Sequence, residues 1–599
     1  MTSNAPFVLL DDARPGRERL RFFSRPHGVI TAHHVGDVAP ALAALADAQA
    51  RGLHAVGYFS YELGYALEPR LIPLMPHRRT VPLLWFALFG EPREMDGEEG
   101  ARWFAQTVTG RAYAGPLRLT QSRQSYAEKF RRVADYIAAG DVYQVNLTFP
   151  AHFAFAGDPC ALYRKLRLRA GAGHGAYIFD GTRYILSFSP ELFFSSDGGA
   201  LTARPMKGTA ARGQDEGEDA RRRVQLSLSD KDRAENLMIV DLIRNDLGRI
   251  AKIGSVRVEE LFAIETYPTV HQMVSTVRAE LRPGISPADL IGAIFPCGSV
   301  TGTPKIRAQE IIRELEPAPR GIYCGAIGCF SPDGSAQFNV AIRTLTIQGA
   351  TGTLGVGGGV VADSRSNDEY DECLLKARYY TEKRPPLSLI ETLRHEPGQG
   401  FVRGELHLAR MARSAQAFGI SFDRSGALQH LNDAVKDVTG PSRARLLLDE
   451  TGAFTATAQS IAPAAPVAPG TVWTYAISER RVLSGDSLAR HKTDWRALYD
   501  QERAAWNERG CDEVVYLNER GEVVEGSTTN IFVRSSGRLL TPPLNSGALD
   551  GCLRRALFES GECTETTLTL SDLDTASVVY LGNSLRGLIE AVPFAHRAN

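Results

Sequence analysis

The chain has 599 residues, enough for about four domain-sized units of roughly 150 residues each. Hydrophobic residues make up 43% and charged residues 23%, as in ordinary globular proteins. Lys and Arg number 68 against 69 Asp and Glu, so no global charge favours binding to nucleic acid or to an anionic membrane.

The sequence shows no targeting segment and no cysteine pattern that would indicate a metal site or a redox motif. The N-terminus lacks the pattern of a secretion signal, and no run of about 18 apolar residues predicts a membrane span. None of the eight cysteines forms a CxxC pair or a cluster with zinc-ligand spacing. We therefore expect a cytoplasmic protein with reduced thiols.

Hydrophobic periodicity predicts a mixture of helices and strands. Helices are expected over 125–139, 217–246 and 367–383, and strands over 142–149, 176–179, 184–194, 201–203, 325–330, 337–347 and 353–361. Pro385 and Pro386 stop the last helix and predict a boundary between domains at 1–384 and 385–599. A strand over 389–394 and an amphipathic helix over 406–419 follow. An Ala/Pro/Gly-rich stretch near 461–468 predicts a break between two subdomains.

Acidic residues of the first domain point to a metal site. Glu369 and Glu372 are three residues apart, which puts both carboxylates on one face of a helix. Joined by another acid from elsewhere, the pair would suit a hard divalent cation. Taken alone, such a pair is more often a solvated helix face.

Two glycine-rich segments could complement this site. The segment PCGSVTGTPK contains Gly298, Ser299 and Thr301, whose backbone N–H groups and hydroxyls could face an anion. The segment GVGGG contains Gly358 and would let the backbone approach a ligand closely. Neither matches a Walker or a Rossmann fingerprint.

The order of seven motifs is far more specific than any one of them. These are GDVYQVNL, SPE, PMKGT, RAEN with VDLIRNDLG, ETYPTVH, PCGSVTGTPK, and GGGVVADS with EYDE. Over residues 50–383 the chain resembles the chorismate-utilising enzymes, which include anthranilate, aminodeoxychorismate, isochorismate and salicylate synthases. The resemblance implies an α+β fold with large antiparallel sheets around a deep central site.

Lys207, in PMKGT, indicates the branch of this family. Anthranilate synthases typically have Ala at the matching position, whereas aminodeoxychorismate synthases have Lys. The resemblance implies that Lys207 attacks C2 of chorismate and expels the 4-hydroxyl, after which ammonia adds at C4. Isochorismate- and salicylate-type synthases also carry Lys here, so this residue separates the chain best from anthranilate synthases.

The same resemblance assigns roles to other residues. Glu191 would protonate the leaving hydroxyl, and His271 would orient the C4 region. Mg²⁺ would be held by Glu235, Glu369 and Glu372 and would bridge to the ring carboxylate of chorismate.

The enolpyruvyl carboxylate would be bound by Arg343 and Tyr323, with Lys376 nearby. No cysteine lies in the context of a glutaminase nucleophile. We therefore expect ammonia to come from a separate glutamine amidotransferase subunit, or to be used free.

A second set of motifs covers residues 387–595. HKTDWR contains Lys492, and EGSTTNIF follows with Glu525. LDGCLR and NSLRG close the set. These motifs resemble the fold-type IV pyridoxal-phosphate (PLP) enzymes, which include branched-chain and D-amino-acid aminotransferases and aminodeoxychorismate lyase. The resemblance implies a two-subdomain α/β unit and dimers formed through this half.

In that family Lys492 would form the Schiff base with PLP and then shuttle a proton. Glu525 would pair with the pyridine nitrogen and keep the ring an electron sink. Arg410 would take the phosphate, aided by backbone N–H groups near Leu549 and Ser584.

The predicted function is therefore a bifunctional enzyme that makes p-aminobenzoate for folate synthesis. The C-terminal motifs do not separate lyase from aminotransferase; the presence of the first half favours the lyase. One alternative is an isochorismate-, salicylate- or anthranilate-type synthase joined to an aminotransferase. A different class is a scaffold with one catalytically dead half, against which the intact site residues argue.

Overall fold

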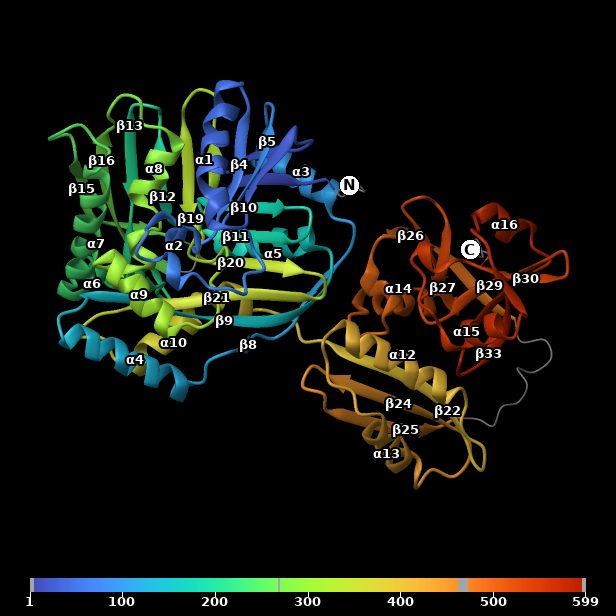
Figure 1. The fold of residues 1–599 in the computed structure, drawn as a ribbon. Helices are drawn as coiled ribbons and strands as arrows, with labels where there is room; N and C mark the ends of the chain where they lie inside the picture. The colour runs from blue at the N-terminus through green and yellow to red at the C-terminus, as the bar shows by residue number, and fades with distance from the viewer. Residues whose placement is uncertain (1–4, 268–269, 462–471, 595–599) are drawn as a thin grey trace. The chain divides into compact units, whose positions relative to one another are not determined.

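The computed structural model describes residues 5–267, 270–461 and 472–594 (Figure 1). Contacts between residues divide the chain into two compact units. The first contains the residues up to 107, then 117–153 and 163–383; the second contains 108–116, 154–162 and the residues from 384. The sequence did not indicate that two short N-terminal segments belong with the C-terminal half. The predicted subdomain break near 461–468 falls on residues 462–471, outside the described residues.

The first unit is built on two large sheets, and the pairings between their strands are antiparallel. One sheet has the order β17 (Gly302–Thr303), β9 (Gln144–Gly157), β21 (Thr351–Val360), β20 (Thr344–Gln348), β11 (Tyr184–Ser189), β10 (His174–Phe179), β1 (Phe7–Asp12), β2 (Arg19–Phe23) and β6 (Arg93–Asp96), with β8 (Arg118–Leu119) beside β9. The other has the order β14 (Met206–Ala211), β16 (Val270–Glu280), β13 (Ala200–Arg204), β12 (Leu192–Ser196), β19 (Ala336–Val340), β18 (Ala326–Phe330), β4 (His54–Phe59), β5 (Leu84–Phe89) and β3 (Gly28–Ala32), with β15 (Arg257–Thr266) beside β16.

A shared apolar core joins these two sheets. Val8, Ile178 and Ile185 come from the first sheet, and Val56 and Ile327 from the second. All five side chains are almost fully buried. Because residues alternate between the faces of a strand, one face of each sheet is apolar and packs against the other. This confirms the predicted α+β fold with large antiparallel sheets.

The helices of this unit lie around the sheets (Figure 1). They are α1 (Val35–Ala50), α2 (Leu63–Leu67), α3 (Gly97–Thr107), α4 (Arg123–Ala138), α5 (Pro159–Ala170), which begins in the second unit, α6 (Glu216–Leu228), α7 (Asp230–Gly248), α8 (Pro287–Ile294), α9 (Lys305–Leu315), α10 (Ser366–Lys376) and α11 (Arg378–Thr381). The single helix predicted over 217–246 is two helices. Ser229 has an extended backbone there, and its hydroxyl caps the N-terminus of α7 by accepting from the Asp232 N–H.

The second unit has two further sheets. A four-stranded sheet has the order β23 (Gly400–Phe401), β22 (Ser388–Glu396), β24 (Ser442–Asp449) and β25 (Phe454–Ser460). A mixed eight-stranded sheet has the order β28 (Val523–Gly526), β27 (Glu513–Asn518), β26 (Trp473–Val482), β33 (Gly587–Pro593), β32 (Val578–Asn583), β29 (Asn530–Ser535), β30 (Arg538–Thr541) and β31 (Cys563–Glu565). The helices of the second unit are α12 (Gly404–Ala417), α13 (Arg424–Val435), α14 (Ala497–Asn507), α15 (Cys552–Glu559) and α16 (Leu570–Thr575).

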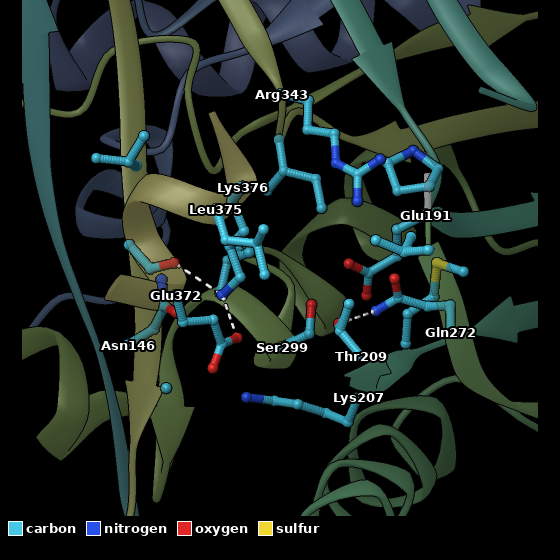
Figure 2. A pocket seen from close by; sticks show the side chains of 18 of the residues that line it. Asn146, Glu191, Lys207, Thr209, Gln272, Ser299, Arg343, Glu372, Leu375 and Lys376 are labelled. Carbon is cyan, nitrogen blue, oxygen red and sulfur yellow. Dashed lines mark hydrogen bonds and ion pairs between the residues drawn. The ribbon is translucent and has the colours of Figure 1, made fainter. Parts of the chain in front are cut away.

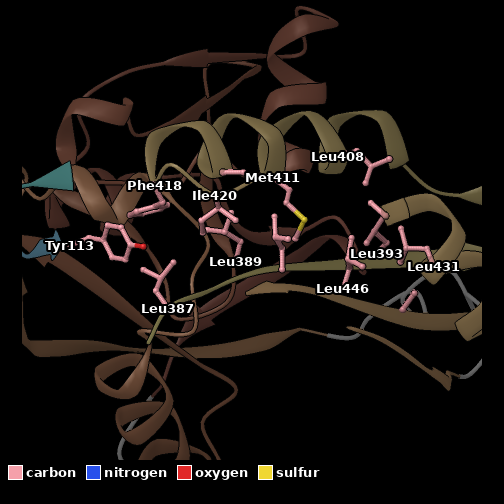
Figure 3. Packing of buried hydrophobic residues seen from close by; sticks show 14 of the residues in the cluster. Tyr113, Leu387, Leu389, Leu393, Leu408, Met411, Phe418, Ile420, Leu431 and Leu446 are labelled. Atoms are coloured by element: carbon pink, nitrogen blue, oxygen red, sulfur yellow. The ribbon is translucent and has the colours of Figure 1, made fainter. Parts of the chain in front are cut away.

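Figure 3 shows the apolar core beside the four-stranded sheet, where α12 covers β22 and β24. We call this part of the second unit the smaller subdomain. One member of this core, Tyr113, comes from β7 (Ala112–Ala114), which pairs with the end of β9. The Tyr113 ring lies 4.9 Å from that of Phe418, edge to face. Arg111 beside it donates to the Asp486 carboxylate at 2.7 Å. Residues 108–116 are therefore an integral part of the second unit.

Two general expectations can be compared with this fold. All eight cysteines are free and buried. In the part of the chain that the structure describes, no helix has both the length and the apolar character needed to cross a membrane.

Candidate active sites

The first unit contains a pocket whose walls come from several distant segments (Figure 2). Its lining joins the turn between β11 and β12, strand β14, helix α7, the turn before β20, strand β21 and helix α10. Most of the residues predicted for the first site lie here: Glu191, Lys207, Glu235, Ser299, Tyr323, Arg343, Glu369, Glu372 and Lys376. The motifs that were recognised separately in the sequence thus meet in one cavity.

Glu191 lies in the turn between β11 and β12 and is only 3% exposed. Burial raises the pKa of its carboxyl to about 7. Its Oε1 atom has no hydrogen-bond partner among the described residues. A carboxyl with these properties holds a proton near neutral pH and can donate it to a ligand in the pocket.

Lys207 extends from β14 into the same pocket (Figure 2). Its Nζ lies 3.8 Å from Oε2 of Glu235 on α7. A Cβ atom at Gly359 would lie 2.4 Å from this Nζ, so the amine would have to move from its position. The position of the amine therefore depends on Gly359, which the sequence did not single out. A run of glycines indicates that a ligand or side chain comes close to the backbone, but it does not show at which residue.

The three predicted metal ligands line the pocket but are held by other groups. Glu235 also lies 3.9 Å from Lys231, and Glu372 Oε1 is 2.9 Å from Lys376 Nζ. Glu369 Oε1 accepts from the Ser364 hydroxyl at 2.7 Å. Their oxygens do not form a close triad of the kind that Glu391, His407 and Cys552 form elsewhere in the described chain. Three carboxylates on one cavity fit a hard cation, provided that a bound ion and substrate replace the lysine contacts.

Arg343 and Tyr323 lie on another part of the wall. Arg343 has a left-handed backbone with φ of 49°, and burial lowers the pKa of its guanidinium. No ion pair is formed by Arg343 within the described residues. The Tyr323 ring lies against Gly355, where a Cβ would come within 2.2 Å of it. A buried cation without a carboxylate partner is suited to an anionic ligand.

Of the remaining predicted residues, only one is on the pocket lining. Ser299 lines the pocket, whereas Gly298 and Thr301 lie beside it, and the Thr301 hydroxyl donates to the Cys297 carbonyl at 2.8 Å. Gly358 does not line the pocket, but a Cβ there would lie 3.0 Å from Glu369 Oε2.

His271 is not on the pocket lining, although its chain neighbours Val270 and Gln272 are, so its predicted role stays a prediction. The ring is buried, and its two nitrogens contact the Thr266 hydroxyl at 3.0 Å and the Asp219 carboxylate at 2.9 Å. Asp219 also pairs with Arg212. In this arrangement His271 links strand β16 to Thr266 of β15 and to Asp219 of helix α6.

A second pocket lies in the second unit, with Lys492 on its wall. The Lys492 carbonyl accepts from the Ile390 N–H, which fixes the backbone against β22. Burial, followed by the charge of Arg410, lowers the pKa of the Lys492 amine to about 8. Glu525 on β28 lines the same pocket, and burial raises the pKa of its carboxyl to about 7. A nucleophilic amine and a buried carboxyl face one cavity, as PLP requires.

Some of the groups predicted to bind the PLP phosphate already have other hydrogen-bond partners. Arg410 forms a bidentate ion pair with Glu391, at 2.9 and 2.6 Å, and donates to the Asp550 carbonyl. Leu549 lines the pocket, and its N–H donates to the Glu525 carboxylate at 2.9 Å. Ser584 lines the pocket and contacts His407 at 2.9 Å. Cys552, the first residue of α15, also lines it, so the helix start offers N–H groups to an anion.

Two family models match the chain. The model for chorismate binding enzymes matches residues 5–382, and the model for class IV amino-transferases matches residues 388–592. The chain therefore belongs to the chorismate binding enzyme family and carries a class IV amino-transferase domain after it.

Individual proteins refine this result. Aminodeoxychorismate synthase component 1 of Escherichia coli is 47% identical over 251 residues, which cover 42% of this chain and 55% of that protein. The chain thus spans about half the length of this relative. A putative isochorismate synthase from Bacillus anthracis is 21% identical over 63% of this chain and 96% of its own, with a TM-score of 0.51. A putative amino-acid aminotransferase from Mesorhizobium loti is 40% identical over 35% of this chain and all of its own, with a TM-score of 0.33.

Proposed function

We propose that the chain makes p-aminobenzoate in two steps. The first unit converts chorismate and ammonia to 4-amino-4-deoxychorismate, and the second removes pyruvate from that product. The observation that carries the proposal is the Lys207 amine in a pocket with the buried Glu191 carboxyl. The similarity to proteins named aminodeoxychorismate synthase component 1 supports it.

In the first step Lys207 attacks C2 of chorismate while the 4-hydroxyl departs as water, taking its proton from Glu191. Ammonia then adds at C4 and Lys207 leaves, which restores the amine. Arg343 holds the enolpyruvyl carboxylate by charge and orients the ring. Glu235, Glu369 and Glu372 would hold Mg²⁺, which would polarise the ring carboxylate. The name component 1 supports a separate amidotransferase subunit as the ammonia source.

In the second step the Lys492 amine takes the proton from C4 of the aminated ring, and the bond between C3 and the enolpyruvyl oxygen breaks, which makes the ring aromatic. The enolpyruvate takes the proton from Lys492 at its methylene carbon and leaves as pyruvate. PLP, when bound, supplies an electron sink for the pair released at C4. Lys492 and Glu525 line the same pocket and would hold the cofactor there: the amine would transfer the proton, and the carboxylate would stabilise a protonated pyridine nitrogen.

Product analysis tests the proposal. The full chain, incubated with chorismate, Mg²⁺, PLP and ammonium, should release p-aminobenzoate, and without PLP it should stop at 4-amino-4-deoxychorismate. Isochorismate or salicylate formed without any ammonia would overturn the proposal in favour of the amine-independent synthases, and anthranilate would favour that branch.

Lys207→Ala should lower aminodeoxychorismate formation by about a thousandfold or more, since the nucleophile is lost. Lys252→Ala is the matched control, because Lys252 lies on the surface in an ion pair with Glu280. Equal rates for the two variants would remove Lys207 from the mechanism.

A further inference from the structure

Gln144 is a buried side chain of the first unit that the steps above do not use. It lies on β9, in the GDVYQVNL motif, to which no role was assigned, and it is 0% exposed. Neither its Oε1 nor its Nε2 atom has a hydrogen-bond partner among the described residues. Because a buried amide without partners is destabilising, such a group in a native fold calls for an explanation.

The end of this side chain lies close to the Lys207 amine. A Cβ atom built on Gly359 would lie 2.4 Å from Lys207 Nζ, 3.1 Å from Gln144 Cδ and 3.3 Å from Gln144 Nε2. Gln144 and Gly359 come from neighbouring strands of one sheet, β9 and β21, whereas Lys207 comes from β14 of the other sheet. The fold thus brings the amine and the carboxamide into the same small region beside Gly359.

The amine is not held by another acceptor. Within the described chain Lys207 forms one ion pair, with Glu235, and its length of 3.8 Å is too great for a hydrogen bond. An amine with N–H donors and a carboxamide with an open acceptor are complementary. Both side chains are unbranched, so rotation about their terminal bonds is enough to bring the two groups into contact.

Gln144 does not contact the cavity itself. Asn146, two residues further along β9 and on the same face of the strand, is on the pocket lining, whereas Gln144 is not. The carboxamide is therefore placed to act on the amine and not on a bound ligand.

We propose that Gln144 positions the Lys207 amine for attack: its Oε1 accepts a hydrogen bond from one N–H of the uncharged amine, which leaves the nitrogen lone pair directed into the pocket. A neutral acceptor suits this task, because a carboxylate at the same place would favour the ammonium form, which has no lone pair. Gln144 is a positioning residue, since it acts through Lys207. The inference rests on the proposed function and adds to it the group that orients the nucleophile.

Gln144→Met tests the inference, because methionine has a similar length and volume but neither polar atom. The full chain is incubated with chorismate, Mg²⁺ and ammonium, and the loss of chorismate is followed whatever the product. The kcat should fall about tenfold, as expected for one lost hydrogen bond to the nucleophile, while the KM for chorismate stays within about twofold. The midpoint of thermal unfolding should stay the same or rise, because an unpartnered buried amide has been removed.

Gln309→Met is the matched control. Gln309 on α9 is 2% exposed and its Oε1 is likewise unpartnered among the described residues, but it lines a different pocket. Its substitution should leave kcat unchanged.

A kcat of Gln144→Met equal to that of this control would overturn the inference. A lower unfolding midpoint that accompanies the fall in kcat would also overturn it, because a purely structural residue would lower both. So would a higher KM for ammonium at constant kcat, which would make Gln144 an ammonia-binding group. Slower loss of chorismate to a product formed without ammonia, such as isochorismate, would support the positioning of Lys207 and contradict only the proposed amination.

Discussion

At the scale of single residues, the most informative side chain is Glu191. Its carboxyl is buried, has an unpartnered oxygen, and has a pKa of about 7 because of burial. Its position next to a turn in SPE predicted a role but not this protonation behaviour. Burial depends on the strands beside the turn, since β11 pairs with β10 and β20, and β12 with β13 and β19, which lie up to about 150 residues away in the sequence.

A pH profile should report this carboxyl. The acid form is the active one, and a raised pKa keeps it populated up to about pH 7. At a constant concentration of uncharged ammonia, the ratio of wild-type kcat/KM to that of Glu191→Gln should fall as pH rises through about 7, because both enzymes need the same uncharged Lys207 amine and only the wild type needs the protonated carboxyl. Below this pH, Glu191→Gln should be slower than the wild type by about a hundredfold or more. A ratio that stays constant from pH 5 to pH 9 would contradict the assignment.

Gly359 makes a second prediction at this scale. Gly359→Ala places a Cβ 2.4 Å from the Lys207 amine and must displace it. Because reactivity depends on alignment, kcat should fall about tenfold or more while the KM for chorismate changes little. Gly292→Ala on α8 is the control, since a Cβ there meets no atom within 4 Å. Equal kcat values for the two variants would show that the amine tolerates the displacement.

At the scale of elements, the sequence predicted part of the helices and strands, including β10, β13, β18, β22 and α12, but it named no element before residue 125 and few in the second unit. It failed where a local cap competes with a continuous helical pattern. The pattern over 217–246 is unbroken in charge and hydrophobicity, yet Ser229 ends α6 and starts α7. A serine hydroxyl can either lie on a helix surface or replace a backbone contact, and the surrounding fold decides between them.

This cap has a testable consequence for the site, because α7 carries Glu235 and Lys231 into the pocket. Ser229→Ala should lower stability by about 1 kcal/mol and weaken the apparent Mg²⁺ affinity by a few fold. Ser286→Ala removes the comparable cap of α8 and should lower stability similarly with unchanged Mg²⁺ dependence. Thermal unfolding and activity at varied Mg²⁺ measure the two effects. An identical dependence of activity on Mg²⁺ in both variants would show that the Ser229 cap does not affect the metal site.

At the scale of the whole molecule, the two halves were predicted as consecutive segments, and the division after Lys383 is present. Residues 108–116 and 154–162 belong to the second unit, which no local pattern could reveal. Their membership depends on contacts with residues more than 250 positions away, such as that of Tyr113 with Phe418. Periodicity describes how an element packs but not which distant element it packs against.

Tyr113→Ala tests how much these segments contribute. The side chain is 1% exposed in the core of the smaller subdomain, so its loss should destabilise the second unit by about 3–5 kcal/mol. Tyr143→Ala is the control, because Tyr143 is 69% exposed. The midpoint of urea-induced loss of the PLP absorbance measures the effect. A midpoint equal to that of the control would indicate that the segment merely covers the core.

The path of the chain between the units, at residues 107–108, 116–117, 153–154, 162–163 and 383–384, has a consequence for proteolysis. A protease that cleaves near Pro385 would cut only one of these connections. The N-terminal fragment would still contain β7, whose Tyr113 side chain is part of the core formed by residues after the cut, and Arg111, which donates to the Asp486 carboxylate. The nicked halves should therefore migrate together through a sizing column in native buffer and separate only in denaturant. The two active sites are in this way kept at a ratio of one to one even after the backbone between them is broken.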